Sequence, residues 1–184
     1  MRPGFAIDRA DLDDPGVRAL RQASVALMDR LFAPESNHYL DEDQQRAKGV
    51  LMFAAREIGA PTAGTPDVPA KGGEVIGCCA LLPCDDGCNA PYGEVKALFT
   101  AEAARGRGVG AALLDRVEAE ARARGLDRLC LETGDLLHAA RRLYRRLGYV
   151  ECPPFGDYDD DPRSVFMQKA LSQTGDACER DGTA

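Results

Sequence analysis

The sequence lacks any long apolar run, and this absence limits the classes of protein to which it can belong. No stretch approaches the roughly 20 apolar residues that a membrane-spanning helix needs. The first residues, MRPGFAIDRADLDD, also lack the hydrophobic segment of a secretory signal. We therefore expect a cytoplasmic protein. Its 184 residues suffice for one domain with a single core, over 1–171, and a disordered polar tail over 172–184.

Basic residues are in deficit. The chain has 23 Lys and Arg against 30 Asp and Glu, which gives a formal net charge of −7. An excess of negative charge argues against nucleic acid or an anionic membrane as the main partner, because both repel it. It slightly favours a neutral or cationic substrate.

The sequence also lacks the paired C-x2-C motifs of structural zinc sites. Four of its seven cysteines cluster at Cys78, Cys79, Cys84 and Cys88, but their spacing is C-C-x4-C-x3-C. An odd number of cysteines without a signal segment predicts reduced thiols. We therefore expect no metal site, and Cys78 and Cys79 serve as small apolar residues of a strand.

The hydrophobic pattern predicts an α/β protein. Three amphipathic helices are expected, the first from Pro15 to near Pro34, the second ending before Gly125, and the third capped by Asp135 and ended by Gly148. Gly- and Pro-rich stretches interrupt the pattern at 59–73 and 83–93 and predict hairpin loops. Strands are expected over 5–8, 50–56, 74–82, 94–100, 126–133, from 149 and over 164–170.

The central stretch of the chain is a strand, a glycine-rich turn and a helix, over 94–121. The turn, Arg105 to Gly110, has glycine at alternate positions, so its backbone can lie close to a ligand. It opens a helix whose first N–H groups have no internal partner and whose dipole is positive at this end. The combination suits a phosphate or pyrophosphate. A plain tight turn before a helix would have the same sequence.

Two familiar phosphate-binding loops fit less well. A nucleoside-triphosphate loop needs Lys and Ser or Thr where Ala111 and Ala112 stand. A dinucleotide fingerprint is matched by Gly106, Gly108 and Ala111, with Glu132 about 20 residues further on. That motif, however, passes directly from the strand into its first glycine. Here 101–105 intervene, and too little chain follows for a second nucleotide-binding half.

The turn instead resembles the R/Q-x-x-G-x-G/A loop of the GNAT superfamily of acyl-CoA N-acyltransferases. The resemblance extends through LETG (131–134) and AARRLYRRLGY (139–149) to the strand near Val165. PESNHYLD (34–41) and PFGDY (154–158) resemble segments of a bacterial subgroup. The resemblance implies a mixed, centrally splayed sheet with helices on both faces. It also implies acetyl-CoA as co-substrate and an amino group as acceptor.

The resemblance assigns the binding of acetyl-CoA to the turn and to the strand before it. The strand backbone would hold the pantetheine as an added strand does, and an N–H of Leu98 or Phe99 would stabilise the oxyanion. The implied cofactor-binding residues are Leu98, Phe99, Thr100, Arg105, Gly106, Arg107, Gly108, Val109, Gly110 and Ala111.

Tyr144 stands where the family often places its general acid, although a tyrosine on the apolar side of a helix is also explained by packing. The family commonly has Asn or Gln seven residues earlier, in contact with the cofactor, and this chain has Leu137. That contact is therefore in doubt, and the adjacent His138 is expected to point elsewhere on the helix.

Glu94 is the first candidate for the general base, because a carboxylate at the start of the central strand could take the amine proton through water. A solvated acid at a strand end is the alternative. Glu132 and His38 are reserve candidates, the latter because imidazole titrates near neutral pH.

Six residues of the PESNHYLD and PFGDY segments are predicted to bind the acceptor. For the first segment, a capping turn into a short helix is the alternative. The expected function is direct acetyl transfer in a ternary complex, and a non-catalytic acyl-CoA sensor is the alternative from another class. The acceptor, a small-molecule or peptide amine, is not defined by the sequence, and a homodimer is left open. The predicted acceptor-binding residues are Asn37, His38, Tyr39, Phe155, Asp157 and Tyr158.

Overall fold

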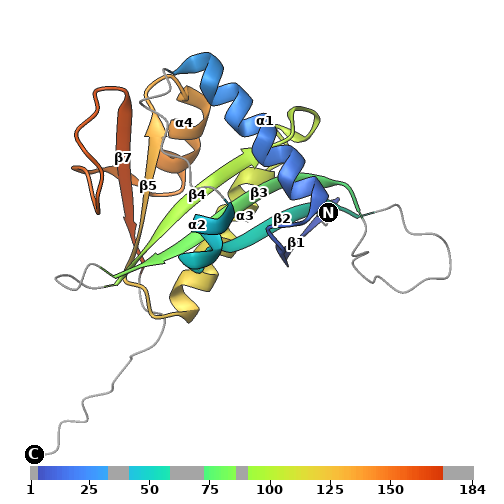
Figure 1. Cartoon of the computed structure of the whole chain (residues 1–184), viewed down its shortest axis with the longest axis horizontal. Helices are drawn as coiled ribbons and strands as arrows, with labels where there is room; N and C mark the ends of the chain where they lie inside the picture. The colour runs from blue at the N-terminus through green and yellow to red at the C-terminus, as the bar shows by residue number, and fades with distance from the viewer. Residues whose placement is uncertain (1–3, 33–41, 59–72, 86–90, 172–184) are drawn as a thin grey trace, which may run out of the picture.

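The structure is a computed structural model that describes residues 4–32, 42–58, 73–85 and 91–171 (Figure 1). Its helices are α1 (Pro15–Leu31), α2 (Glu42–Ala47), α3 (Val109–Ala123) and α4 (His138–Arg146), with a short 3₁₀ turn at Glu102–Ala104. Among the described helices, none combines the length and the apolar character needed to cross a membrane. The strands are β1 (Phe5–Ala10), β2 (Leu51–Glu57), β3 (Val75–Cys84), β4 (Tyr92–Thr100), β5 (Arg128–Gly134), β6 (Val150–Glu151) and β7 (Ser164–Ala170).

The strands form one sheet that is divided near its centre. Their order is β1-β2-β3-β4-β5-β7-β6, and the only parallel pair among the described strands is β4 with β5. These two strands pair only where Tyr92–Glu94 face Arg128–Cys130. Beyond that point they diverge, as Figure 1 shows. The prediction of a mixed, centrally splayed sheet is confirmed.

Helices cover both faces of the sheet. Successive residues of a strand point to opposite faces, so each strand contributes side chains to two cores. On β2, Phe53 packs in the larger core beneath α3, whereas its neighbour Met52 packs in the smaller core beneath α1. The adjacent Cys79 and Cys78 divide between the same two cores. The predicted strand at 74–82 is therefore buried on both sides, and the predicted helices on both faces are present (Figure 1).

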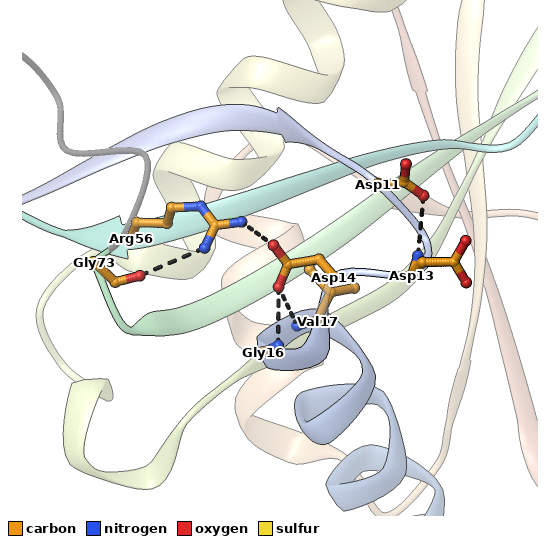
Figure 2. A network of polar contacts seen from close by, with 7 residues as sticks. All are labelled: Asp11, Asp13, Asp14, Gly16, Val17, Arg56 and Gly73. Carbon is orange, nitrogen blue, oxygen red and sulfur yellow. Dashed lines mark hydrogen bonds and ion pairs between the residues drawn. The ribbon is translucent and has the colours of Figure 1, made fainter.

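The start of α1 is fixed by Asp14. Its Oδ1 accepts hydrogen bonds from the N–H groups of Gly16 and Val17, at 2.9 and 3.2 Å, and so caps the helix. Its Oδ2 accepts from Arg56 of β2 at 2.5 Å, and Arg56 also donates to the carbonyl of Gly73 (Figure 2). The cap thus joins α1 to the sheet that it covers. This matters for function because α1 forms one wall of the cavity described below.

The helix after the glycine-rich turn matches its prediction. Glu118 pairs with Arg122 at 3.1 Å and Glu120 with Arg124 at 3.0 Å, both at the i,i+4 spacing. Gly125 follows the helix with φ of +71°, a conformation that glycine adopts without strain. The apolar side predicted for this helix is buried and consists of Val109, Leu113, Leu114, Val117 and Ala121.

The predicted start of α4 is wrong. Asp135 does not cap it, because the helix begins at His138, with Leu137 at the capping position. The N–H of Leu137 bonds to the carbonyl of Gly134, which forms a turn between β5 and the helix. The Asp135 carboxylate instead pairs with Arg163 at 3.1 Å. Leu136 consequently lies outside the helix, with 41% of its surface exposed.

Candidate functional site

A cavity of about 1300 Å³ occupies the space where β4 and β5 diverge. Its walls come from α1, from the divergent parts of β4 and β5, from the first turn of α3 and from α4. The structure therefore brings together most of the site residues predicted from the sequence. Those that line the cavity are Glu94, Leu98, Phe99, Thr100, Arg105, Gly106, Gly108, Val109, Gly110, Ala111, Tyr144 and Tyr158.

A β-bulge shapes the β4 wall of this cavity. Ala97 has φ of +52°, which is rare for a residue with a Cβ. The pairing with β3 shifts here, because Cys78 faces Phe99 whereas Ala80 faces Lys96, so β4 has one residue more than β3. A bulge bends the strand and changes the direction of the groups that follow it. The backbone of Leu98–Thr100, predicted to bind the cofactor, follows directly.

The glycine-rich turn contributes an open surface at the start of α3. Gly106 and Gly108 have φ of +77° and +83°, and apart from the adjacent residues of the chain no atom lies within 4 Å of where a Cβ would stand on either. The backbone conformation at both positions favours glycine, and the space beside them is open to a ligand. Gly110 differs, because a Cβ there would lie 3.1 Å from Leu143 of α4. The turn, with the positive end of the helix, therefore fits a phosphate group.

Arg107 is the one residue of the turn whose side chain points away from the cavity lining. It forms a double hydrogen bond with Glu57 at the end of β2, at 2.6 and 3.1 Å. The bond from Arg107 lowers the pKa of Glu57 below its usual value. The side chain thus fastens the turn to the sheet, and Arg107, although predicted to bind the cofactor, does not line the cavity.

Glu94, Lys96 and Tyr158 form a hydrogen-bonded group in the cavity. Oε1 of Glu94 lies 2.6 Å from the Tyr158 hydroxyl, which donates to it, and 2.8 Å from Nζ of Lys96. Lys96 also donates to the Tyr158 oxygen at 2.7 Å. Burial and the nearby Glu94 charge raise the pKa of Tyr158, so its hydroxyl stays protonated at neutral pH. Glu94 is 6% exposed, which contradicts the alternative of a solvated strand-end acid.

Lys96 was not among the residues predicted from the sequence. The available signal was its position two residues after Glu94, because alternate residues of a strand share a face. Glu132 was a reserve candidate, and the structure places it in the cavity lining, where its Oε1 accepts from Ser164 at 2.7 Å.

Tyr144 lies between the core and the cavity. Its ring is 6% exposed and lies 5.7 Å from the ring of Tyr149, so it belongs to the core, yet it also lines the cavity. Within the described ranges, no group accepts a hydrogen bond from its hydroxyl. Burial raises the pKa of Tyr144, which keeps the proton available for donation at neutral pH.

The PFGDY segment reaches the cavity through Tyr158. Phe155 lies behind it, in edge-on contact with Tyr92, Tyr158 and Phe166 at centroid distances of 5.2 to 5.9 Å. Phe155 therefore supports Tyr158, while Asp157 is exposed and lies outside the cavity lining. The predicted acceptor residues Asn37, His38 and Tyr39 lie outside the described residues.

Several other lining residues were not predicted. Leu137 and His138 both line the cavity, so the expectation that His138 points elsewhere is wrong. The helix starts at His138 rather than at Asp135, and this changes the direction of its first residues. Phe32 at the end of α1 and Arg163 before β7 complete the wall, and no sequence motif marks either.

The buried cysteines do not provide a nucleophile. Burial raises the pKa of Cys78 to about 12, and that of Cys79 higher still, so both thiols are protonated at neutral pH. Among the residues that the structure describes, no group of three or more His, Cys, Asp or Glu is arranged to hold a metal ion.

Known proteins that this chain resembles in sequence are named acetyltransferases. The model of the acetyltransferase (GNAT) family matches residues 24–149. The IAA acetyltransferase of Azospirillum brasilense is 37% identical over 92% of this chain and 99% of its own length. The uncharacterized N-acetyltransferase YsnE of Bacillus subtilis (strain 168) is 34% identical over 88% of this chain and 96% of its own.

Solved structures show the same fold. A proposed acyl-CoA N-acyltransferase from Klebsiella pneumoniae superposes with a TM-score of 0.73 at 32% identity, over 93% of this chain and all of the other. A GNAT family acetyltransferase from Elizabethkingia anophelis with acetyl-CoA bound superposes with a TM-score of 0.60 over 92% of this chain and all of the other. Its identity of 16% supports the fold alone.

Proposed function

Because the chain belongs to the acetyltransferase (GNAT) family of acyltransferases, we propose that it moves an acetyl group from acetyl-CoA to the amino group of an acceptor, by direct attack in a ternary complex. One observation carries the proposal. A single cavity is lined by the glycine-rich turn before α3, by the bulged strand β4, by the hydrogen-bonded carboxylate of Glu94 and by the protonated Tyr144.

Acetyl-CoA, as co-substrate, supplies the acetyl group as a thioester. The open surface beside Gly106 and Gly108 would hold its pyrophosphate against the N–H groups that begin α3. Arg105 lines the same part of the cavity and adds positive charge. The backbone after the bulge, over Leu98–Thr100, would bind the pantetheine, and an N–H of Leu98 or Phe99 would face the carbonyl oxygen as negative charge develops on it.

The amine nitrogen forms a bond to the acetyl carbon as the carbon–sulfur bond breaks, the amine loses a proton and the thiolate gains one. Glu94 is the proposed base. Its Oε1 already accepts from Tyr158 and Lys96, so its Oε2 would take the proton, directly or through water. Tyr144 is the proposed acid, because its buried hydroxyl holds its proton at neutral pH.

The alternatives considered from the sequence are less well supported. A dinucleotide-binding fold has a largely parallel sheet, whereas this one has a single parallel pair among the described strands. A sensor without catalysis would not need the Glu94 and Tyr144 groups in the same cavity, and the relatives identified above are named acetyltransferases. The protonated state of Cys78 and Cys79 supports direct transfer rather than an acyl-enzyme.

The acceptor would bind on the α1 side of the cavity, where Tyr158 lies. The subgroup segments 34–41 and 154–158 would contribute to this region, with Asn37, His38 and Tyr39 as further contacts. These assignments stay predictions, as does the attraction of an ammonium group to Asp157.

Two measurements on two variants test the function. We expect the protein to bind acetyl-CoA in calorimetry and to release CoA thiol when amines are added. Gly108→Glu should abolish binding, because it places a negative side chain in the phosphate site. Gly125→Glu is the matched control, since Gly125 also has positive φ but follows the far end of α3. Equal binding by both variants would overturn the phosphate site, and binding without CoA release from any amine would favour the sensor.

A further inference from the structure

The walls of the cavity carry apolar side chains that the protein leaves exposed. Of the large apolar residues in the described ranges, Val25 and Leu136 are among the most exposed, at 36% and 41%, and both line the cavity. Val25 lies on α1 and Leu136 in the turn before α4, so two separate elements present such groups to the same space. Exposed apolar groups in a concave site indicate a ligand with an apolar part.

The α1 side of this apolar wall is continuous. Val25, Met28 and Phe32 are spaced by three and four residues, lie on one side of the helix and its end, and all line the cavity. The Phe32 ring is held against Gly134, where an added Cβ would come within 2.1 Å of it. The ring is therefore fixed at the end of β5 and does not depend on a ligand for its position.

The cavity is also cationic, although the chain is acidic overall. Among the described residues, seven Lys and Arg side chains line it, against three carboxylates. Arg105, Arg142 and Arg146 belong to the glycine-rich turn and to α4, the side assigned to the cofactor phosphates. Of the other cations, Arg18 pairs with Asp13 and Lys96 pairs with Glu94.

Arg163 lies against the apolar wall. Its guanidinium lies 5.6 Å from the centre of the Phe32 ring, and its side chain is 44% exposed. One of its terminal nitrogens, Nη1, pairs with Asp135 at 3.1 Å. A guanidinium has several donors in one plane, so it can hold a second carboxylate while keeping the first.

We propose that the acceptor is an apolar α-amino acid, bound by its carboxylate at Arg163 and by its side chain against Val25, Met28, Phe32 and Leu136. This inference rests on the acetyl-transfer function proposed above. Its amino group would reach Glu94 through water. Glu94 faces Cys130 of β5, whereas Arg163 precedes Ser164, which faces Gly134 four residues further along that strand. The amine nitrogen then forms the amide bond as the thioester bond breaks, and the products are an N-acetyl amino acid and CoA.

Matched acceptors test the inference. CoA release is measured at saturating acetyl-CoA with L-phenylalanine, with 2-phenylethylamine, which lacks the carboxylate, and with L-serine, which lacks the apolar side chain. We expect L-phenylalanine, L-leucine or L-methionine to give a kcat/KM at least about tenfold above both comparison compounds, because a charged hydrogen bond and an apolar contact each contribute that much.

Variants then assign the two contacts. Arg163→Gln should raise the KM for the best apolar amino acid about tenfold or more and leave that for 2-phenylethylamine unchanged. Leu136→Asn and Val25→Asn should raise the KM for the apolar amino acid and also for 2-phenylethylamine, because both compounds carry the apolar group. Arg145→Gln and Val150→Asn are the matched controls, because Arg145 and Val150 are exposed and lie outside the cavity lining.

The outcomes separate this inference from the function on which it rests. Preference for L-serine, for 2-phenylethylamine or for a polyamine, with normal turnover, would overturn the amino-acid inference and leave the acetyltransferase intact. An equal effect of Arg163→Gln on all acceptors would overturn the role of Arg163. Acetyl-CoA binding without turnover of any amine would instead contradict the proposed function.

Discussion

The hydroxyl of Tyr158 donates a 2.6 Å hydrogen bond to Oε1 of Glu94, across 64 positions of the sequence. The bond joins the turn between β6 and β7 to the strand that borders the central divergence. Lys96 contacts both groups and completes a closed set of three. The proposed base is therefore held in position by a segment from the other half of the sheet.

Removing that hydroxyl should reduce turnover without unfolding the protein. Tyr158→Phe keeps the ring that packs against Phe155 and Phe166, but it removes the donor to Glu94. A hydrogen bond to a charged group contributes about 1.5–3 kcal/mol, so we expect kcat/KM to fall about tenfold or more. Steady-state kinetics measures the loss. A variant with full activity would show that Tyr158 does not position Glu94.

Tyr144→Phe should lower kcat by about 10² or more and leave the affinity for acetyl-CoA nearly unchanged, because a general acid acts only as the thiolate departs. Tyr149→Phe provides the matched control. The Tyr149 hydroxyl is buried and has no hydrogen-bond partner among the described residues, so its removal should cost neither activity nor stability. Equal activity of both variants would assign Tyr144 to packing alone.

The cap of α1 should make stability depend on acid pH. Burial raises the pKa of Asp14, but the hydrogen bonds from Arg56 and from the N–H groups of Val17 and Gly16 outweigh burial, so its pKa lies below the usual 3.8. The carboxylate therefore stabilises the fold at pH above 3.8, and this contribution is lost as the pH falls through the lowered pKa.

Asp14→Asn should lower the free energy of unfolding by about 1 kcal/mol at pH 7, because asparagine still caps the helix but cannot pair with Arg56. The difference from the unmodified protein should shrink below pH 3.8. Urea denaturation at several pH values measures it. Asp13→Asn, at a side chain that is 53% exposed, should change stability by less than about 0.5 kcal/mol. A difference that does not depend on pH would contradict the assignment.

Gly134→Ala should affect the acceptor rather than acetyl-CoA. A Cβ at this position would lie 2.1 to 2.8 Å from atoms of the Phe32 ring, so the ring must move. We expect a KM for the acceptor raised severalfold and an unchanged dissociation constant for acetyl-CoA, measured by kinetics and calorimetry. Equal weakening of both substrates would point to a general disturbance of β5.

The sequence predicted the elements that depend on local patterns. The apolar spacing of α3, its ion pairs and its terminal Gly125 all follow from helix geometry, and the structure has them. It failed where a distant contact decides the local structure. Asp135 has the chemistry of a helix cap, but Arg163 holds its carboxylate. A partner 28 positions away cannot be recognised from the residues around Asp135.

The same limit applies to the candidate site. The glycine-rich turn was predicted because its glycines stand close together in the sequence, and Gly106 and Gly108 do have positive φ. The bulge at Ala97 was not predicted, because alanine rarely adopts positive φ and nothing nearby marks the position. The group of Glu94, Lys96 and Tyr158 depends on the order of strands β4, β5 and β7 in the sheet, which becomes known only with the topology.

The short pairing of β4 with β5 has a consequence for the solubility of the protein. Past Glu94 and Cys130, each strand presents a sheet edge toward the other, and unpaired edges are the usual starting points of aggregation. Here the two edges face each other inside the molecule, under α1 and α4. A strand of another protein molecule would have to displace these helices to reach them. An opening of this kind thus keeps backbone groups available to a slender ligand and protects them from other protein chains.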